Sequence, residues 1–234
     1  ENGHAIGYFW GYKTAGIFQS QQDINNWIAA GNGVLQSNVQ PGDVKYVDVN
    51  HDGTINANDK VDLGNGLPKY TFGFNFTLGY KGFDLSANFT GAAGFQIAQS
   101  YRDPSGSQGN YSHRILGRWT GEGTSNEMPR VTYGDVGNWL FSDLYLQDGD
   151  YIRLQNLTLG YDFKNLISWK GLSKLRLYFQ VQNLFTLTKY DGMDPEIGSY
   201  NGTDGNSSDS WVSGVDMGYY PHPRTFIVGV NVAF

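Results

Sequence analysis

The chain contains no cysteine among its 234 residues. Disulfide bonds and thiolate metal sites are therefore excluded, whereas the redox compartment stays open. Basic residues are also scarce, because 16 Lys and Arg stand against 22 Asp and Glu, for a formal net charge of −6. Since the sequence has no basic stripe either, no nucleic-acid partner is expected.

Long apolar runs are missing as well. No stretch approaches the ~18 consecutive apolar residues of a membrane-spanning helix, and the mean hydropathy is −0.43. The first residues, Glu1–His4, lack the basic start and the apolar centre of a secretory signal peptide. If the protein is bound to a membrane, it is bound through alternating strands, and a cell-envelope location predicts that the chain is a mature or cleaved piece.

Glycine and aromatic residues, by contrast, are abundant. Gly accounts for 32 of the 234 residues and aromatics for 15%, and the share of Gly is about twice the usual one. Five stretches alternate apolar and polar residues, and a period of two predicts strands that each have one apolar face. These strands are predicted at 70–80, 83–93, 151–163, 174–184 and 224–234.

The stretch 70–80 shows the alternation most clearly. Its even positions carry six large apolar residues, and its odd positions carry only Thr, Asn and Gly. The first set is too apolar for water and the second too polar for a packed core, whereas a barrel wall between lipid and a wet lumen suits both. At ~3.3 Å per residue and a tilt near 45°, such a strand rises roughly 25 Å, the height of an outer-membrane apolar band. The predicted class is all-β, with antiparallel strands of a transmembrane β-barrel.

The first two strands allow an internal check. Only Lys81 and Gly82 separate them, so a two-residue hairpin pairs Tyr80 with Phe83. The same register brings apolar residues opposite one another along both strands, and a slip of one residue would mix the faces.

The third stretch, 151–163, breaks phase, because its apolar residues move from even to odd positions. A β-bulge near Gln155–Asn156 reconciles the two halves. Alternatively, the first residues of this stretch rise above the membrane and face different neighbours.

The connections between strands are alternately short and long. Residues 81–82 and 164–173 form the short ones, whereas 94–150 and 185–223 span 57 and 39 residues. Outer-membrane barrels have short periplasmic turns and long extracellular loops, so 1–69, 94–150 and 185–223 are predicted to be extracellular. Five strands cannot close a barrel, because an open edge in lipid leaves backbone groups unsatisfied. The chain is therefore expected to be the C-terminal part of a larger barrel, or to be completed by a separate chain.

Residues 48–59 match the twelve-position calcium loop. Oxygen-bearing side chains stand at positions 1, 3 and 5, a glycine at 6 allows the sharp turn, and an aspartate stands at 12, where its reach is shorter than that of the usual glutamate. The alternative is a solvated turn in which Asp and Asn side chains cap their own backbone. The predicted ligands of a structural Ca²⁺ are Asp48, Asn50, Asp52, Thr54 (through its carbonyl) and Asp59.

Four loop aromatics lie near Asn and Asp residues: Trp139, Trp211, Tyr219 and Tyr220. In that setting they are candidate stacking surfaces for the sugar rings or peptide side chains of a ligand. Interfacial girdles and packing between loops explain such aromatics at least as often.

Phe234 ends the last amphipathic stretch. A terminal aromatic in that place resembles the signal by which the barrel-assembly machinery recognises its clients, and a lipid-facing end residue is the simpler alternative. Trp169, in a predicted periplasmic turn, is expected to be an interface anchor.

Six phrases of the sequence form a recognisable set: Gly11–Gln19, Pro41–Asn50, Tyr80–Ser86, Asp150–Tyr161, Gln182–Thr186 and Tyr220–Phe226. Together, and in this order, they resemble the C-terminal portion of the SusC/RagA family of TonB-dependent outer-membrane transporters. The resemblance implies a 22-stranded barrel in the bacterial outer membrane, of which this chain is roughly the last quarter. It also implies a plug domain and an N-terminal barrel part outside these residues, and a SusD-like surface lipoprotein as partner. Import of oligosaccharides or peptides, driven by TonB pulling on the plug, would be the function.

Three other interpretations stay open. A family barrel can serve as a scaffold that holds partner proteins in an envelope complex without importing anything. An outer-membrane enzyme would need Asp, His or Ser groups that converge at the rim, and the four histidines are dispersed, so no enzyme is expected. A soluble β-sandwich tolerates the polar faces as its outside, but it explains neither the short and long connections nor the terminal phenylalanine.

Overall fold

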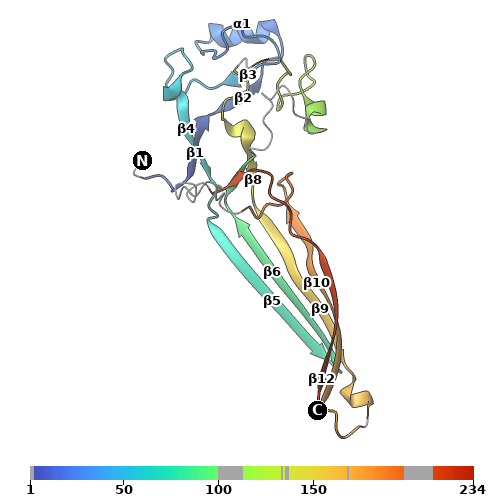
Figure 1. Ribbon diagram of the computed structural model, residues 1–234. Helices are drawn as coiled ribbons and strands as arrows, with labels where there is room; N and C mark the ends of the chain where they lie inside the picture. The colour runs from blue at the N-terminus through green and yellow to red at the C-terminus, as the bar shows by residue number, and fades with distance from the viewer. Residues whose placement is uncertain (1–2, 100–112, 133, 135–136, 168, 198–212) are drawn as a thin grey trace. The chain divides into compact units, whose positions relative to one another are not determined.

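The computed structural model of the chain describes residues 3–99, 113–132, 134, 137–167, 169–197 and 213–234. The chain divides into two compact units (Figure 1). The sheet unit comprises Leu67–Phe95, Asp148–Glu196 and Tyr219–Phe234, and the loop unit comprises Glu1–Gly66, Gln96–Gln147 and Ile197–Gly218.

The sheet unit is built on five antiparallel strands in the order β12–β10–β9–β6–β5 (Figure 1). In chain order, they are β5 (Tyr70–Tyr80), β6 (Phe83–Ala93), β9 (Tyr151–Asp162), β10 (Lys174–Thr188) and β12 (Thr225–Ala233). All five strands expected from the sequence are present. Three strands differ in their bounds: β10 runs on to Thr188, β9 ends before the short helix η4 (Phe163–Leu166), and β12 is one residue shorter at each end than expected.

The hairpin between β5 and β6 has the predicted register. Tyr80 lies opposite Phe83, and the pairing continues without a shift to Tyr70 opposite Ala93. Both turn residues have positive φ, 46° at Lys81 and 90° at Gly82. A tight hairpin turn that follows the right-handed strand twist requires this backbone conformation, and glycine adopts it without steric cost.

A bulge in β9 confirms the explanation of the broken phase. Asn88 faces Asn156 and Phe89 faces Leu154, so Gln155 is the extra residue. On the other side of β9 the register with β10 shifts between Gln182 and Phe185. This second irregularity resets the alternation in β10, which is why the sequence pattern placed the end of that strand too early.

Register across the sheet separates apolar from polar residues in continuous rows. Two neighbouring apolar rows are Leu78–Leu85–Leu159–Phe179–Val228 and Phe76–Ala87–Leu157–Val181–Phe226. A polar row, Asn75–Asn88–Asn156–Gln182–Thr225, runs on the opposite face. The sheet therefore has one face for an apolar environment and one for a polar environment.

The loop unit contains short elements that the sequence analysis placed only as loop. Helix α1 (Gln21–Ala29) begins after Ser20, whose hydroxyl accepts a hydrogen bond from the backbone N–H of Asp23 at 3.2 Å. The strands form three small sheets, β1 (Tyr8–Tyr12) with β4 (Lys60–Asn65), β2 (Thr14–Ile17) with β3 (Val44–Tyr46), and β11 (Val215–Asp216) with β7 (Gln96–Gln99) and β8 (Leu146–Asp148). Three single-turn helices complete the elements: η1 (Ala57–Asp59), η2 (His113–Gly117) and η3 (Asp143–Tyr145).

A small core holds the loop unit together. It consists of Tyr12, Ile17, Val44, Tyr46 and Ile55, all buried. All of these except Ile55 lie on strands three to five residues long, which are too short for an alternation to stand out in the sequence. Within the described residues, no helix is both long and apolar enough to cross a membrane.

Candidate functional site

The apolar face of the sheet unit is uncovered. Along β5, the exposed fractions of Phe72, Phe74 and Phe76 are 44%, 59% and 42%. On the opposite edge strand, Phe226 and Val228 are 62% and 72% exposed. A soluble β-sandwich would bury these side chains against a second sheet, so that alternative does not fit the sheet unit. Large exposed apolar patches mark surfaces that meet lipid or another protein.

Hydrogen bonds between side chains run along the polar face. Asn88 donates to Asn75 at 2.6 Å, and Gln180 donates to Asn156 at 3.1 Å. Arg176 forms a two-pronged ion pair with Asp84, with its Nε donating to Oδ1 at 2.7 Å and its Nη2 donating to Oδ2. This face therefore presents amides, hydroxyls and a self-neutralised pair of charges.

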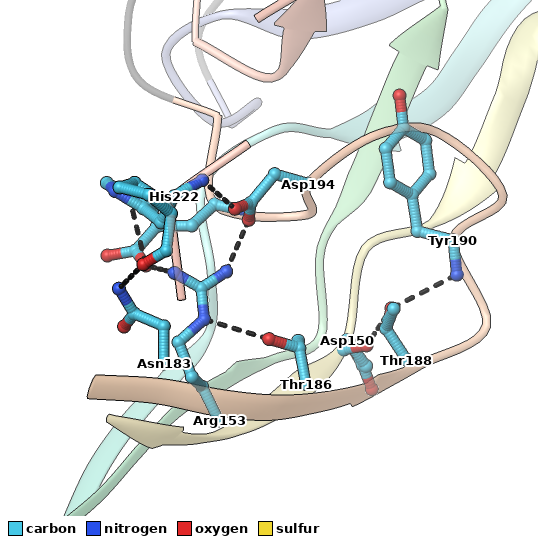
Figure 2. A network of polar contacts seen from close by, with 10 residues as sticks. Asp150, Arg153, Asn183, Thr186, Thr188, Tyr190, Asp194 and His222 are labelled. Carbon is cyan, nitrogen blue, oxygen red and sulfur yellow. Dashed lines mark hydrogen bonds and ion pairs between the residues drawn. The ribbon is translucent and has the colours of Figure 1, made fainter. Parts of the chain in front are cut away.

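Arg153, near the start of β9, is the centre of a buried polar network (Figure 2). Its Nη1 donates to Glu196 Oε2 at 2.7 Å, its Nε donates to Thr186 Oγ1 at 2.9 Å, and its Nη2 forms an ion pair with Asp194. Arg153 is 3% exposed and Asp194 6%. A buried guanidinium is tolerated only when its charge and its donors are satisfied, and these three acceptors meet that requirement.

The same network fixes the chain segments around Asp194 and His222. Asp194 Oδ1 accepts from the backbone N–H of Glu196 at 2.9 Å, and Asp194 Oδ2 accepts from that of His222 at 3.1 Å. Nearby, Asn183 donates to the carbonyl of Pro223 at 3.1 Å (Figure 2). We call Arg153, Thr186, Asp194, Glu196 and His222 the arginine clasp. It ties the segments after β10 and before β12 to the ends of β9 and β10.

The calcium-type loop forms a turn held by its own carboxylates. Asp48 accepts from the backbone N–H groups of Gly53 at 2.7 Å and Asp52 at 3.2 Å. Asp59 accepts from those of Val49 at 3.0 Å and Asn56 at 2.7 Å. Gly53 has φ +81°, which places the sharp turn at the predicted sixth position.

The two end carboxylates of this loop are buried, with Asp48 2% and Asp59 0% exposed. Burial, followed by the negative charge of Asp59, raises the pKa of Tyr12 above its ordinary value. Among the described residues, no group of three or more His, Asp or Glu side chains is arranged to hold a metal ion. The carboxylate oxygens of Asp48 and Asp59 accept hydrogen bonds from the loop's own backbone, as in an Asx-rich turn.

The candidate ligand-binding aromatics fall in different parts of the chain. Trp139 is half-buried in the loop unit, beside the buried Asn138. Tyr219 and Tyr220 belong to the sheet unit, where Tyr219 is half-buried and Tyr220 is 89% exposed. Trp211 lies outside the described residues. Tyr219 and Tyr220 are therefore adjacent only because they are consecutive in the chain, and Trp139 belongs to the other unit.

Phe234 lies at the end of the sheet unit where η4 also lies (Figure 1). Its ring contacts that of Trp169 edge to face, with centroids 6.0 Å apart. Both rings are exposed, 82% for Phe234 and 58% for Trp169. An exposed aromatic pair beside an apolar sheet face is typical of a membrane interface.

Comparison with known proteins identifies relatives of the chain. No family model matches the chain. TonB-dependent receptor P3 of Formosa agariphila is 33% identical over 234 residues, a match that covers 99% of this chain and 22% of the relative. TonB-dependent receptor SusC of Bacteroides thetaiotaomicron is 29% identical over 205 residues, which cover 86% of this chain and 18% of SusC.

The chain is homologous to TonB-dependent receptors of the SusC type. It spans about a fifth of the length of P3 and SusC. The solved structure of the RagAB peptide transporter matches 97% of this chain and 23% of that chain, with a TM-score of 0.67 and 20% identity. A second structure, the RagAB peptide importer in its open-open state, matches with a TM-score of 0.66. These matches show the fold.

As a relative of SusC, the chain is an outer-membrane protein, and its five long strands are part of a β-barrel wall. The predicted family, all-β class and location are confirmed. The barrel is not closed within these strands, since β5 and β12 are both edges of the sheet. In the wall of a barrel, the exposed apolar face meets lipid and the face with Asn75, Asn88 and Asn156 meets the lumen.

The arginine clasp was missed by the sequence analysis. Arg153 stands within the phrase Asp150–Tyr161, but its acidic partners lie more than 40 positions further along the chain. One signal was available: Arg153 is the one charged residue in the stretch 151–161, and such an arginine needs a buried partner or a polar surface. Which of the 22 acidic residues would supply it could not be read from spacing.

Proposed function

We propose that the protein is a TonB-dependent outer-membrane transporter that imports oligosaccharides or peptides. The match of nearly the whole chain to TonB-dependent receptors supports this proposal, and so does the wall-like sheet with one apolar and one polar face. In the proposal, TonB acts on a plug domain outside this chain, and a SusD-like surface lipoprotein covers the mouth. RagAB, whose solved structures share this fold, is a peptide importer. The chain carries no enzymatic activity in this account.

The polar face fits a lumen for neutral, hydrogen-bonding cargo. Its amide and hydroxyl side chains, such as Asn75, Asn156 and Thr158, donate and accept hydrogen bonds but carry no charge. The charges of Arg176 and Asp84 neutralise one another. Sugar hydroxyls and peptide groups both form hydrogen bonds of this kind, so the lumen face supports either cargo class.

We further propose that Trp139, Trp211, Tyr219 and Tyr220 contact the cargo. Flat aromatic rings stack on sugar rings and on peptide side chains. Tyr220 is the most accessible of the described three, so Tyr220→Ala is expected to weaken cargo binding by the full-length protein several-fold. Tyr70→Ala is a matched control, because Tyr70 is 70% exposed on the lipid-facing side of β5. Equal affinities for Tyr220→Ala and the unmodified protein would reject a contact at Tyr220.

A structural Ca²⁺ in the loop 48–59 is also part of the proposal. Asp48, Asp52 and Asp59 carry three negative charges within twelve residues, and the loop contains neither Lys nor Arg. Hard oxygen ligands of this kind suit Ca²⁺. The turn would then exchange some of its backbone hydrogen bonds for the ion, with Asn50 and the Thr54 carbonyl completing the ligand set. Its role would be to stiffen the loop unit.

The function is tested by uptake in the parent bacterium. Deletion of the full-length gene should abolish growth on the cargo, and the intact gene supplied on a plasmid should restore it. A strain that lacks TonB should show the same loss. If the deletion leaves uptake unchanged but dissociates an envelope complex, the transporter proposal fails and the scaffold function takes its place.

A further inference from the structure

The short-turn end of the sheet unit differs in charge from the rest of the chain. Segments 81–84 and 162–176 hold five of the 16 Lys and Arg but only two of the 22 Asp and Glu. They carry a formal +3, while the remainder of the chain carries −9. Antiparallel pairing brings these segments to one end of the sheet, because Phe83 lies opposite Tyr161 and Lys174 lies opposite Ala233.

The acidic groups at this end are occupied by local partners. Asp84 pairs with Arg176, and Asp162 accepts from the backbone N–H of Lys164 at 2.9 Å. The ammonium group of Lys164 is also held locally, since it donates to the carbonyls of Trp169 and Leu172. Three exposed lysines remain, Lys81, Lys170 and Lys174, which we call the basic turn cluster.

An aromatic group adjoins the basic turn cluster. Phe83 and Tyr161 have ring centroids 4.4 Å apart, and Tyr161 and Phe163 4.8 Å apart. The Nζ of Lys81 lies 5.2 Å from the centroid of the Tyr80 ring. In barrels, aromatic girdles lie at the level of the lipid headgroups. Lys81 and Lys170, which follow Tyr80 and Trp169 directly in the chain, therefore reach the headgroup layer or the water just beyond it. Lys174 begins β10 at the same end of the sheet, on the polar face that also carries Arg176.

We propose that the basic turn cluster binds the phosphate groups of anionic phospholipids in the adjoining membrane leaflet. The partner follows from charge complementarity: three exposed ammonium groups lie at the end of the sheet that also carries the aromatic group, on a chain that is otherwise acidic. Each lysine near an anionic membrane surface strengthens association by about five-fold. The inference rests on the outer-membrane location of the sheet and is independent of the cargo.

The test uses the full-length protein reconstituted in mixed phosphatidylethanolamine and phosphatidylglycerol, with native mass spectrometry to count the phosphatidylglycerol retained. Triple substitution of Lys81, Lys170 and Lys174 by Gln should lower retention at least about three-fold. The matched control replaces Lys13, Lys69 and Lys189 by Gln, which removes the same charge from exposed lysines elsewhere. This control should retain as much phosphatidylglycerol as the unmodified protein.

Two further arms keep the inference falsifiable if the glutamine variant does not fold. Triple substitution of the cluster by Arg should preserve retention, and raising the salt from about 50 mM to about 500 mM should reduce it in the unmodified protein. Inorganic phosphate at constant ionic strength should not displace phosphatidylglycerol, because it lacks the acyl chains. Equal retention by the Gln variant, salt-insensitive retention, or displacement by inorganic phosphate would each overturn the proposal.

Discussion

Arg176 on β10 reaches Asp84 on β6 across Gly160 of the intervening strand β9. A Cβ atom at position 160 would lie 2.5 Å from Arg176 Nε and 2.5 Å from Asp84 Oδ1. Glycine is therefore needed at this position because the ion pair occupies the space of a side chain. The pair links three strands of the barrel wall on the lumen side.

Replacement of this glycine should break the link. We expect Gly160→Val to lower the free energy of unfolding of the full-length barrel by about 1–2 kcal/mol, since a charged hydrogen-bonded pair is lost. Gly79→Val is the matched control, because Gly79 pairs with Asp84 in the same row and a Cβ there meets nothing closer than 3.9 Å. Urea denaturation measures the free energy of unfolding of both variants. Equal destabilisation by the two variants would mean that valine itself, and not the ion pair, is responsible.

The arginine clasp gives a larger predicted effect. Arg153→Met leaves Asp194 and Glu196 without their cation, so we expect a loss of about 3–5 kcal/mol in stability and faster proteolysis near residue 196. Arg224→Met removes an exposed arginine two residues after His222 of the clasp and should lower the stability far less. Adding Asp194→Asn and Glu196→Gln to Arg153→Met should recover part of the stability. Unchanged proteolysis in Arg153→Met would show that the clasp does not hold the segment.

The calcium proposal predicts a metal-dependent shift in stability. A ligand present at about 100 times its Kd adds about 2.7 kcal/mol to the folded state, so Ca²⁺ should raise the melting temperature of the loop unit in the full-length protein. Asp48→Asn with Asp59→Asn should abolish that shift, and Glu122→Gln, at an exposed acidic residue outside the loop, should not. If the unmodified protein shows no heat of Ca²⁺ binding at millimolar concentration, the loop is an Asx-rich turn and nothing more.

Insertion of the full-length barrel into the outer membrane should depend on Phe234. Deletion of this residue is expected to lower the amount of the full-length protein inserted in the outer membrane several-fold, whereas Phe234→Tyr should be tolerated. Trp169→Ala removes the ring contact at 6.0 Å but keeps the terminal aromatic. An equal loss in Trp169→Ala would assign the effect to the ring contact, and normal yield after deletion would reject the assembly signal.

The barrel strands could be predicted from sequence because a period of two repeats over about ten residues in each. The Lys81–Gly82 turn fixed the β5–β6 register without long-range information, and the phase break at Gln155 identified the bulge. The loop unit could not be predicted in the same way, because strands such as β3 and β11 are shorter than two alternations. The arginine clasp depends on pairing between Arg153 and residues more than 40 positions away, which periodicity does not encode.

The lipid exposure of the apolar face is the central claim, and a pair of spin labels tests it directly. Phe74→Cys and Asn75→Cys place labels on opposite faces of β5 at the same height in the full-length, reconstituted protein. The Phe74 label should be relaxed by oxygen, which concentrates in hydrocarbon, and the Asn75 label by a water-soluble nickel chelate. If the Phe74 label were relaxed mainly by the nickel chelate, or were shielded from both reagents, the face would not lie against lipid, and the barrel-wall account would be contradicted.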